Sequence, residues 1–171
     1  MIMEIKQLIH SEVTNNSKSK EIIIITDNIR TPENIGMLFR ISEAFGVKKV
    51  FLVGDSPDLT NRKVLRTARN TEKELNIQYF DEMQPLLDSI KKDNYFLIGL
   101  ELTNNSQNIK NYDFNKHQKI ALFIGAERFG ISDTTLQNIN TCVHIEMFGK
   151  NSSMNVVNAL SICLYEIVTK N

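Results

Sequence analysis

The sequence is poor in several residue types whose abundance would mark a special class of protein. Its 171 residues include two cysteines, three prolines, seven glycines and no tryptophan. Cys142 and Cys163 have neither CxxC nor metal-ligand spacing, which argues against a disulfide framework and favours buried apolar residues in a reducing compartment. No apolar run is long enough to span a bilayer, and Met1 to His10 lacks the apolar core of a secretory signal. We therefore expect a cytoplasmic protein with no membrane partner.

Excess positive charge is also missing, since the formal net charge is zero. A protein that coats nucleic acid by bulk charge is therefore not expected, and any such binding needs a local basic face. One candidate is the segment Leu59 to Lys73, which has a single acid, Glu72. Helical spacing would place Arg62, Arg66 and Arg69 on one face. A solvated face and a phosphate-binding stripe are both open for this segment.

Unbroken apolar runs alternate with helical patterns along most of the chain. Such runs suit strands that helices cover on both faces, so the alternation predicts an α/β fold: an open, mostly parallel sheet with helices on both faces. The strands are expected at 22–25, 47–53, 77–80, 95–100, 119–124 and 142–146, and the helices at 31–45, 59–73, 82–91, 133–138 and 152–169.

The length indicates one domain, with a short appendage at most. We expect residues 1–20 to form a short amphipathic helix, Met1 to Ser11, and a polar linker whose lysines are solvated. The domain is then residues 21–171.

Three loops are expected at the carboxyl ends of strands, where open α/β sheets bind ligands. They follow Leu100, span Gly125 to Gly130, and span Met147 to Ser153. The glycine loop matches neither a Walker motif nor GxGxxG, although its glycines allow close approach to a ligand. A tight turn explains that loop equally well. Glu127 within it is either an exposed turn residue or a buried carboxylate that needs a cation or several donors.

Arg40 or Arg128 is the expected cation for Glu127 in the second case. The third loop leads into the last helix, for which Asn151, Ser152 and Ser153 are plausible caps. That helix is apolar around most of its circumference, so we expect it to be fully buried, with a second copy of the chain covering its outer face.

Three motifs in order carry a resemblance to a known family. They are Asn34-Ile35-Gly36 followed by Arg40, then Phe123 to Ser132 (FIGAERFGIS), then Ile145 to Ala159 (IEMFGKNSSMNVVNA). With these motifs the chain resembles the SpoU (TrmH-like) RNA 2′-O-methyltransferases, a knotted class that depends on S-adenosylmethionine. The resemblance runs from about Glu21 to the C-terminus.

The resemblance implies a deep trefoil knot in the C-terminal part of the sheet, an exception to unknotted topology. It implies a homodimer that builds each active site from both chains, with no metal. It also implies that the methyl donor is held by loops at Leu100, Gly125, Ile145, Met147 and Met154.

The catalytic residue implied by the resemblance is Arg40, which would act on a ribose 2′-hydroxyl. Arginine stays protonated at ordinary pH, so we expect Arg40 to clamp the adjacent phosphate and polarise the hydroxyl rather than act as a base. The residues implied to position Arg40 and the ribose are Asn34, Glu127, Ser153 and Asn155.

The basic segment around Arg62, Arg66 and Arg69 is similar to that of tRNA-modifying members, so tRNA is favoured over rRNA. With about 20 residues ahead of the core, we expect RNA recognition to use the core itself. The third motif departs from the family pattern at three positions: Glu146 replaces proline, Met154 leucine, and Val157 serine. Glu146 would place a charge near the adenine pocket, so the alternative function is a non-catalytic RNA-binding module with the same fold.

Overall fold

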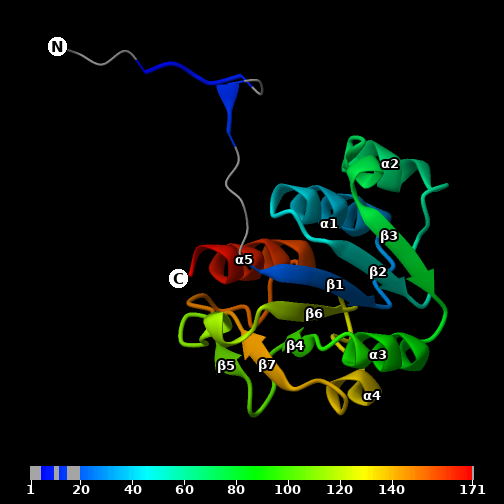
Figure 1. Ribbon diagram of the computed structural model, residues 1–171, viewed down its shortest axis with the longest axis vertical. Coiled ribbons are helices and arrows are strands. Elements are labelled where there is room, and N and C mark those ends of the chain that lie inside the picture. The colour runs from blue at the N-terminus through cyan, green and yellow to red at the C-terminus, as the bar shows by residue number, and fades with distance from the viewer. Residues whose placement is uncertain (1–4, 10–11, 15–19, 171) are drawn as a thin grey trace.

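A computed structural model describes residues 5–9, 12–14 and 20–170 of the protein (Figure 1). Strands and helices alternate along the chain as expected. The strands are β1 (Glu21–Asp27), β2 (Lys49–Val53), β3 (Asn76–Phe80), β4 (Phe96–Leu100), β5 (Gln107–Asn108), β6 (Lys119–Gly125) and β7 (Thr141–His144). The α-helices are α1 (Pro32–Ala44), α2 (Arg62–Ala68), α3 (Met83–Lys92), α4 (Asp133–Leu136) and α5 (Val156–Thr169), with short 3-10 turns η2 (Thr71–Glu74) and η3 (Phe114–Lys116).

The seven strands form one sheet in the order β3-β2-β1-β6-β4-β7-β5. Every pairing between these strands is parallel, so the predicted open parallel sheet is confirmed. β1 lies beside both β2 and β6, with Ile24 in register with Val50 on one side and Leu122 on the other. The carboxyl ends of β1, β4, β6 and β7 therefore meet at one edge. The predicted trefoil knot and the division of the chain at about residue 20 stay predictions.

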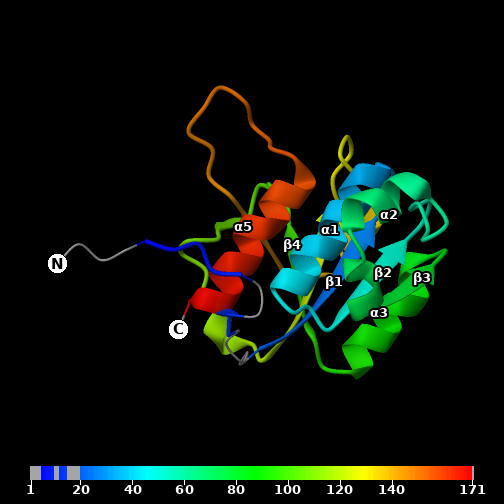
Figure 2. The same cartoon turned by 90° about the horizontal axis from the view of Figure 1, so that it is seen from above.

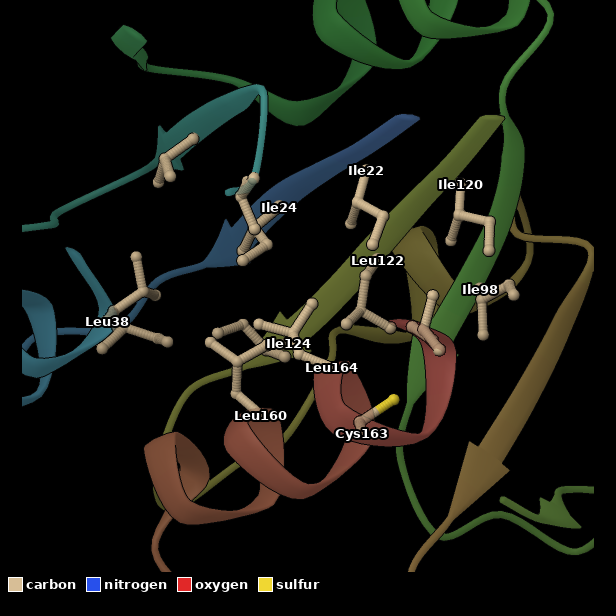
Figure 3. Close-up of a cluster of buried hydrophobic side chains, with 14 of the residues drawn as sticks. Ile22, Ile24, Leu38, Ile98, Ile120, Leu122, Ile124, Leu160, Cys163 and Leu164 are labelled. Carbon is tan, nitrogen blue, oxygen red and sulfur yellow. The ribbon is translucent and has the colours of Figure 1, made fainter. Parts of the chain in front are cut away.

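Helices cover both faces of the sheet, as predicted: α1, α2 and α5 lie on one side and α3 and α4 on the other (Figure 1). The β1 side chains alternate between two apolar cores. Ile22 and Ile24 belong to the core beneath α1 and α5 (Figure 3), whereas Ile23 and Ile25 belong to the core that includes α3. Each such fully buried side chain contributes about 1.5–3 kcal/mol to stability. This rigid sheet fixes where its edge loops begin.

The predicted N-terminal helix is wrong over the part that the structure describes. Ile5–Ile9 has no regular secondary structure, and the remainder of the prediction lies outside the described residues. Ile5 is 99% exposed, Leu8 60% and Ile9 63%, so the described part of the predicted apolar face is largely uncovered. A short helix is marginal in water without such packing, which explains the failure of the periodicity argument.

The linker lysines were expected to be solvated, and this is wrong for Lys20. Its side chain is buried, and Nζ donates to Asn115 Oδ1 at 2.6 Å and to the Ile167 carbonyl at 3.3 Å. A cation at the C-terminal end of α5 meets carbonyls that have no partner within the helix and lies at the negative end of its dipole. Lys20 therefore ties the start of β1 to the end of the last helix.

The last helix begins later than predicted. Asn155 is its N-cap, with Oδ1 accepting from the Val157 amide at 2.9 Å, so the three predicted caps at 151–153 are wrong. The strand before it also ends early, at His144 instead of residue 146. Residues 145–155 therefore form one long loop, which projects from the sheet edge in Figure 2.

The basic segment forms a shorter helix than predicted. α2 ends at Ala68, and its C-cap Arg69 adopts the left-handed conformation with φ 54°. Arg62 and Arg66 share a face, whereas Arg69 leaves the helix, so the prediction of one helical face is wrong for Arg69. Within the described residues, no helix is long and apolar enough to cross a membrane.

Candidate active site

A pocket of about 480 Å³ opens where β4, β6 and β7 end. It is bounded by the loop after β6 and the loop before α5, both of which project from the same edge of the molecule (Figure 2). All the residues predicted to hold a cofactor line it: Leu100, Gly125, Ile145, Met147 and Met154. Ligand pockets commonly occupy about 300–1,000 Å³. The structure therefore brings the predicted cofactor residues together in a cavity of suitable size.

Two backbone hydrogen bonds close the base of the loop after β6. The Ala126 and Gly130 backbones bond to each other in both directions, at 3.0 and 2.8 Å. A Cβ added at Gly125 would lie 1.9 Å from the Gly130 carbonyl carbon, and Gly130 itself has φ +66°. Only glycine at Gly125 lets the two backbones approach this closely. The glycines predicted to serve a ligand thus also build the loop that forms the pocket wall.

Glu101 is a pocket residue to which the sequence assigned no role. Its two carboxylate oxygens accept from the backbone amides of Ile131 and Leu102, both at 3.0 Å. The carboxylate therefore joins the end of β4 to the loop after β6. An acidic residue directly after a buried strand was the available signal, because such a position is expected at a ligand-binding edge.

A chain of side-chain hydrogen bonds links all three motifs at the pocket rim. Asn155 Nδ2 donates to Asn34 Oδ1 at 3.0 Å, and Asn34 Nδ2 donates to Glu127 Oε1 at 2.7 Å. Because Asn155 also caps α5, its orientation is fixed from both ends. Three of the predicted catalytic residues, far apart in the sequence, are therefore in contact.

Glu127 is ionised within this chain. Burial raises the pKa of its carboxyl, but hydrogen bonds from Thr31, its own amide and Asn34 outweigh burial and hold the pKa below its usual value. The partners are neutral donors, so the predicted pairing with Arg40 or Arg128 is wrong. Neutral donors suffice because Glu127 is exposed, as the first of the two alternatives for it supposed, so its charge stays in contact with water.

Arg40 lies on α1, six residues beyond Asn34, and is outside the pocket lining. Its Nη1 contacts Met37 Sδ at 3.9 Å, and no ion pair to it occurs among the described residues. Ser153 lines the pocket near Asn155, whereas Arg40 does not touch the Asn34–Glu127–Asn155 chain. The structure of one chain thus assembles the predicted site without its predicted catalytic arginine.

Glu146 does not disturb the pocket. Its side chain is exposed and accepts from Asn108 Nδ2 at 3.0 Å, on the neighbouring strand β5. The residues on either side of it, Ile145 and Met147, line the cavity instead. The charge expected near the adenine site therefore points elsewhere.

Arg62, Arg66 and Arg69 are all exposed on or beside α2. α2 can pack closely on α1 because Gly36 of α1 has no side chain. A Cβ at this position would lie 2.6 Å from Thr67 Cβ of α2. α1 carries both Asn34 and Arg40. The basic segment is therefore held at a fixed position relative to the motif residues of α1.

Comparison with known proteins agrees with these three motifs. The profile of the SpoU rRNA Methylase family matches residues 21–165. The chain is 28% identical over 155 residues to tRNA (guanosine(18)-2'-O)-methyltransferase of Saccharomyces cerevisiae, a match that covers 88% of this chain and 10% of that protein. It is 25% identical over 152 residues to 23S rRNA (guanosine-2'-O-)-methyltransferase RlmB of Escherichia coli, covering 89% of this chain and 61% of RlmB.

Solved structures share the fold. The SpoU methyltransferase AviRb from Streptomyces viridochromogenes superposes with a TM-score of 0.80 at 24% identity, over 88% of this chain and 59% of AviRb. The chain thus spans less than two thirds of the length of these relatives. With its family profile matched from β1 into α5, the chain belongs to the SpoU rRNA Methylase family.

Proposed function

We propose that the protein transfers a methyl group from S-adenosylmethionine to a ribose 2′-hydroxyl of RNA. The observation that carries the proposal is the pocket itself. It holds every predicted cofactor residue, and the Asn34–Glu127–Asn155 hydrogen-bond chain joins the three family motifs at its rim. Relatives named as tRNA and rRNA 2′-O-methyltransferases support the same reaction.

The residues of the pocket fit S-adenosylmethionine. Leu100, Met154 and Ala159 supply apolar surface suited to an adenine ring, and the backbone around Gly125 and Ile145 offers donors and acceptors for its edge. The negative carboxylates of Glu101 and Glu127 line the pocket and would attract the positively charged sulfonium of the cofactor. When bound, the cofactor would supply the methyl group: a bond from the ribose 2′-oxygen to the methyl carbon would form, the carbon–sulfur bond would break, and the electron pair of the broken bond would stay on sulfur.

The protein's contribution to this step is alignment. Reacting atoms need to be held about 3–3.5 Å apart, so the residues of the site would have to fix the ribose 2′-hydroxyl beside the bound methyl donor. The Asn34–Glu127–Asn155 chain supplies a rigid polar edge against which the ribose can lie. Arg40 would hold the neighbouring phosphate with its planar fork and polarise the hydroxyl, whose proton is released to water.

Two measurements test the proposal together. Calorimetry should detect binding of S-adenosylmethionine to the protein alone, and methyl-labelled cofactor with total RNA should yield ribose-methylated nucleotides on digestion. Binding of RNA without any binding of the cofactor would favour the alternative, a non-catalytic RNA-binding module. The exposed position of Glu146 removes one motive for that alternative.

The preference for tRNA over rRNA rests on the basic segment, since the relatives include both kinds of enzyme. Replacing Arg62, Arg66 and Arg69 with alanine is expected to weaken tRNA binding and to reduce the slope of log affinity against log salt by up to about three, since each phosphate contact adds roughly one. Fluorescence anisotropy with unmodified tRNA at several salt concentrations measures both. A matched control replaces Lys91 and Lys92, exposed on α3 across the sheet. An unchanged slope in the arginine variant would assign the segment to a solvated face.

We further propose a cytoplasmic homodimer through α5, with no metal. One face of α5 packs on the sheet, but Ile162 and Tyr165 on the other face are 40% and 58% exposed, so the predicted complete burial does not occur within one chain. A second copy would cover this apolar face, and Arg40 of one copy would then be available to the site of the other.

Aspartate at both Ile162 and Tyr165 is expected to convert the dimer into a monomer, because the charges cannot be desolvated at an apolar contact. Light scattering at micromolar concentration checks this, with Tyr79 on the edge strand β3 replaced by aspartate as the control. A monomeric wild-type protein would contradict the proposed dimer.

A further inference from the structure

The cofactor pocket carries more negative than positive groups among the described residues that line it. Its titratable lining residues are Glu101, Glu127, Arg128 and His144. Glu127 and Arg128 are exposed, whereas Glu101 is half-buried. Water and salt screen exposed charges strongly and partly buried charges much less. A ligand in the pocket therefore meets the charge of Glu101 with the least screening.

The carboxylate of Glu101 is also held in one position. Oε1 accepts from the Leu102 amide and Oε2 from the Ile131 amide, both at 3.0 Å. Its own backbone amide donates to the Val143 carbonyl at 2.9 Å, which ties the residue to β7. Gly130 lies directly against the carboxylate, since a Cβ there would be 2.3 Å from Oε2. A charge fixed in this way needs no reorganisation when a cation arrives.

The proposed reaction removes one positive charge from the ligand of this pocket. S-adenosylmethionine contains a sulfonium, whereas its product S-adenosylhomocysteine contains a neutral thioether at the same position. The two molecules share the adenine, the ribose and the amino-acid end, so contacts with those parts cannot distinguish them. A fixed carboxylate in the pocket wall attracts the sulfonium and has no comparable attraction for the thioether.

We propose that Glu101 makes the pocket selective for the positively charged methyl donor over its neutral product. The inference rests on the proposed methyl transfer, because only that reaction turns a cationic ligand of this pocket into a neutral one. Without such selectivity, accumulated product would compete equally for the pocket. With it, a new donor molecule displaces the product after each transfer.

A purely structural role for Glu101 leads to a different expectation. The two amide hydrogen bonds join the end of β4 to the loop after β6, and glutamine supplies a carbonyl oxygen in place of only one carboxylate oxygen. A loosened loop would weaken every ligand of the pocket alike. The ratio of the affinities for charged and neutral ligands therefore separates the two roles, whatever Glu101→Gln does to the loop.

Calorimetric titration at neutral pH with three ligands tests the proposal. They are S-adenosylmethionine, S-adenosylhomocysteine and sinefungin, whose ammonium group replaces the methylsulfonium and so keeps the charge without the methyl group. The wild-type protein is expected to bind S-adenosylhomocysteine about tenfold more weakly than either charged ligand. Glu101→Gln is expected to weaken both charged ligands about tenfold relative to S-adenosylhomocysteine, which abolishes the preference.

Glu146→Gln is the matched control. It removes an equal charge from a neighbouring strand end, but the Glu146 side chain is exposed, accepts from Asn108 and lies outside the pocket lining. This variant should keep all three affinities within about twofold of the wild type. If Glu101→Gln fails to fold, Glu127→Gln removes the other carboxylate of the described lining instead, and the preference for charged ligands should persist in it.

The outcomes that contradict this role of Glu101 are distinct from failure of the proposed function. Equal affinity of the wild-type protein for charged and neutral ligands would overturn the selectivity alone. Equal weakening of all three ligands by Glu101→Gln would leave Glu101 a structural residue, and loss of the preference in Glu127→Gln would assign it to Glu127. A wild-type protein that binds none of the three ligands would overturn the proposed function and this inference together.

Discussion

Alanine in place of Arg40 is expected to reduce methyl transfer to RNA by at least roughly 10²- to 10⁴-fold, the usual contribution of a positioned polar catalyst. Binding of S-adenosylmethionine should be unchanged, because Arg40 lies outside the lining of the cofactor pocket. The effect should therefore appear in kcat with RNA and be absent from calorimetric titration with the cofactor.

The surroundings of Arg40 explain why it should be available to RNA. Leu38 and Phe39 beside it are buried in the core, so α1 is rigid at this point. Its guanidinium contacts the thioether of Met37 and forms no ion pair within the described residues. Its fork of donors is therefore free to meet a phosphate, from this chain's RNA or from RNA held mainly by a partner copy.

Arg40→Lys is the informative control. Lysine keeps the charge but loses the planar bidentate fork. It should retain the salt dependence of RNA binding and lose most of the rate, whereas a purely electrostatic role would leave the lysine variant nearly active. Both variants should melt within a few degrees of the wild type, because Arg40 contributes no buried ion pair within the described part of the chain. Wild-type turnover by the alanine variant would remove Arg40 from the mechanism.

The parts of this site that were predictable are those set by strand ends. The β-branched run Ile22 to Ile25 and the similar run in β6 are typical of a covered parallel sheet, and their carboxyl ends had to share one edge. Leu100 and Gly125 are the last residues of two such strands and Ile145 directly follows a third, so their meeting in one pocket follows from the order of elements. Each loop alone can be explained as a simple turn. The three motifs in their order are specific enough to indicate the family.

The remaining features depend on contacts between distant segments. By residue type, good N-caps for the last helix are Asn151, Ser152, Ser153 and Asn155. Asn155 is the one that caps α5, and it also donates a hydrogen bond to Asn34 of α1. Lys20 was expected to be solvated because its partner carbonyl at Ile167 is distant in the sequence. Neither residue carries a local signal of its tertiary partner.

The second large effect is expected from a substitution at Gly125, where the loop after β6 closes. Gly125→Ala should raise the Kd for S-adenosylmethionine at least about 100-fold and destabilise the protein by about 1–3 kcal/mol, the usual cost of overpacking. The added Cβ would lie 2.1 Å from the Ile131 amide nitrogen and 2.3 Å from the Gly130 carbonyl oxygen, so backbone must move. That movement would break the paired Ala126–Gly130 hydrogen bonds and displace the wall that this loop gives the cofactor pocket.

Gly149→Ala provides the matched comparison, because nothing lies within 4 Å of its Cβ position. It should change stability by less than about 0.5 kcal/mol and leave cofactor affinity unaltered. If Gly125→Ala fails to fold, Gly130→Ala gives an intermediate case. Its Cβ would lie 2.3 Å from Glu101 Oε2, so the carboxylate could move aside only by giving up its hydrogen bond from the Ile131 amide, and the backbone at φ +66° also disfavours alanine. Calorimetry and thermal melting should thus rank affinity as Gly149→Ala above Gly130→Ala above Gly125→Ala. Wild-type affinity in a folded Gly125→Ala protein would show that the cofactor does not depend on this loop, and the assignment of the pocket would then be wrong.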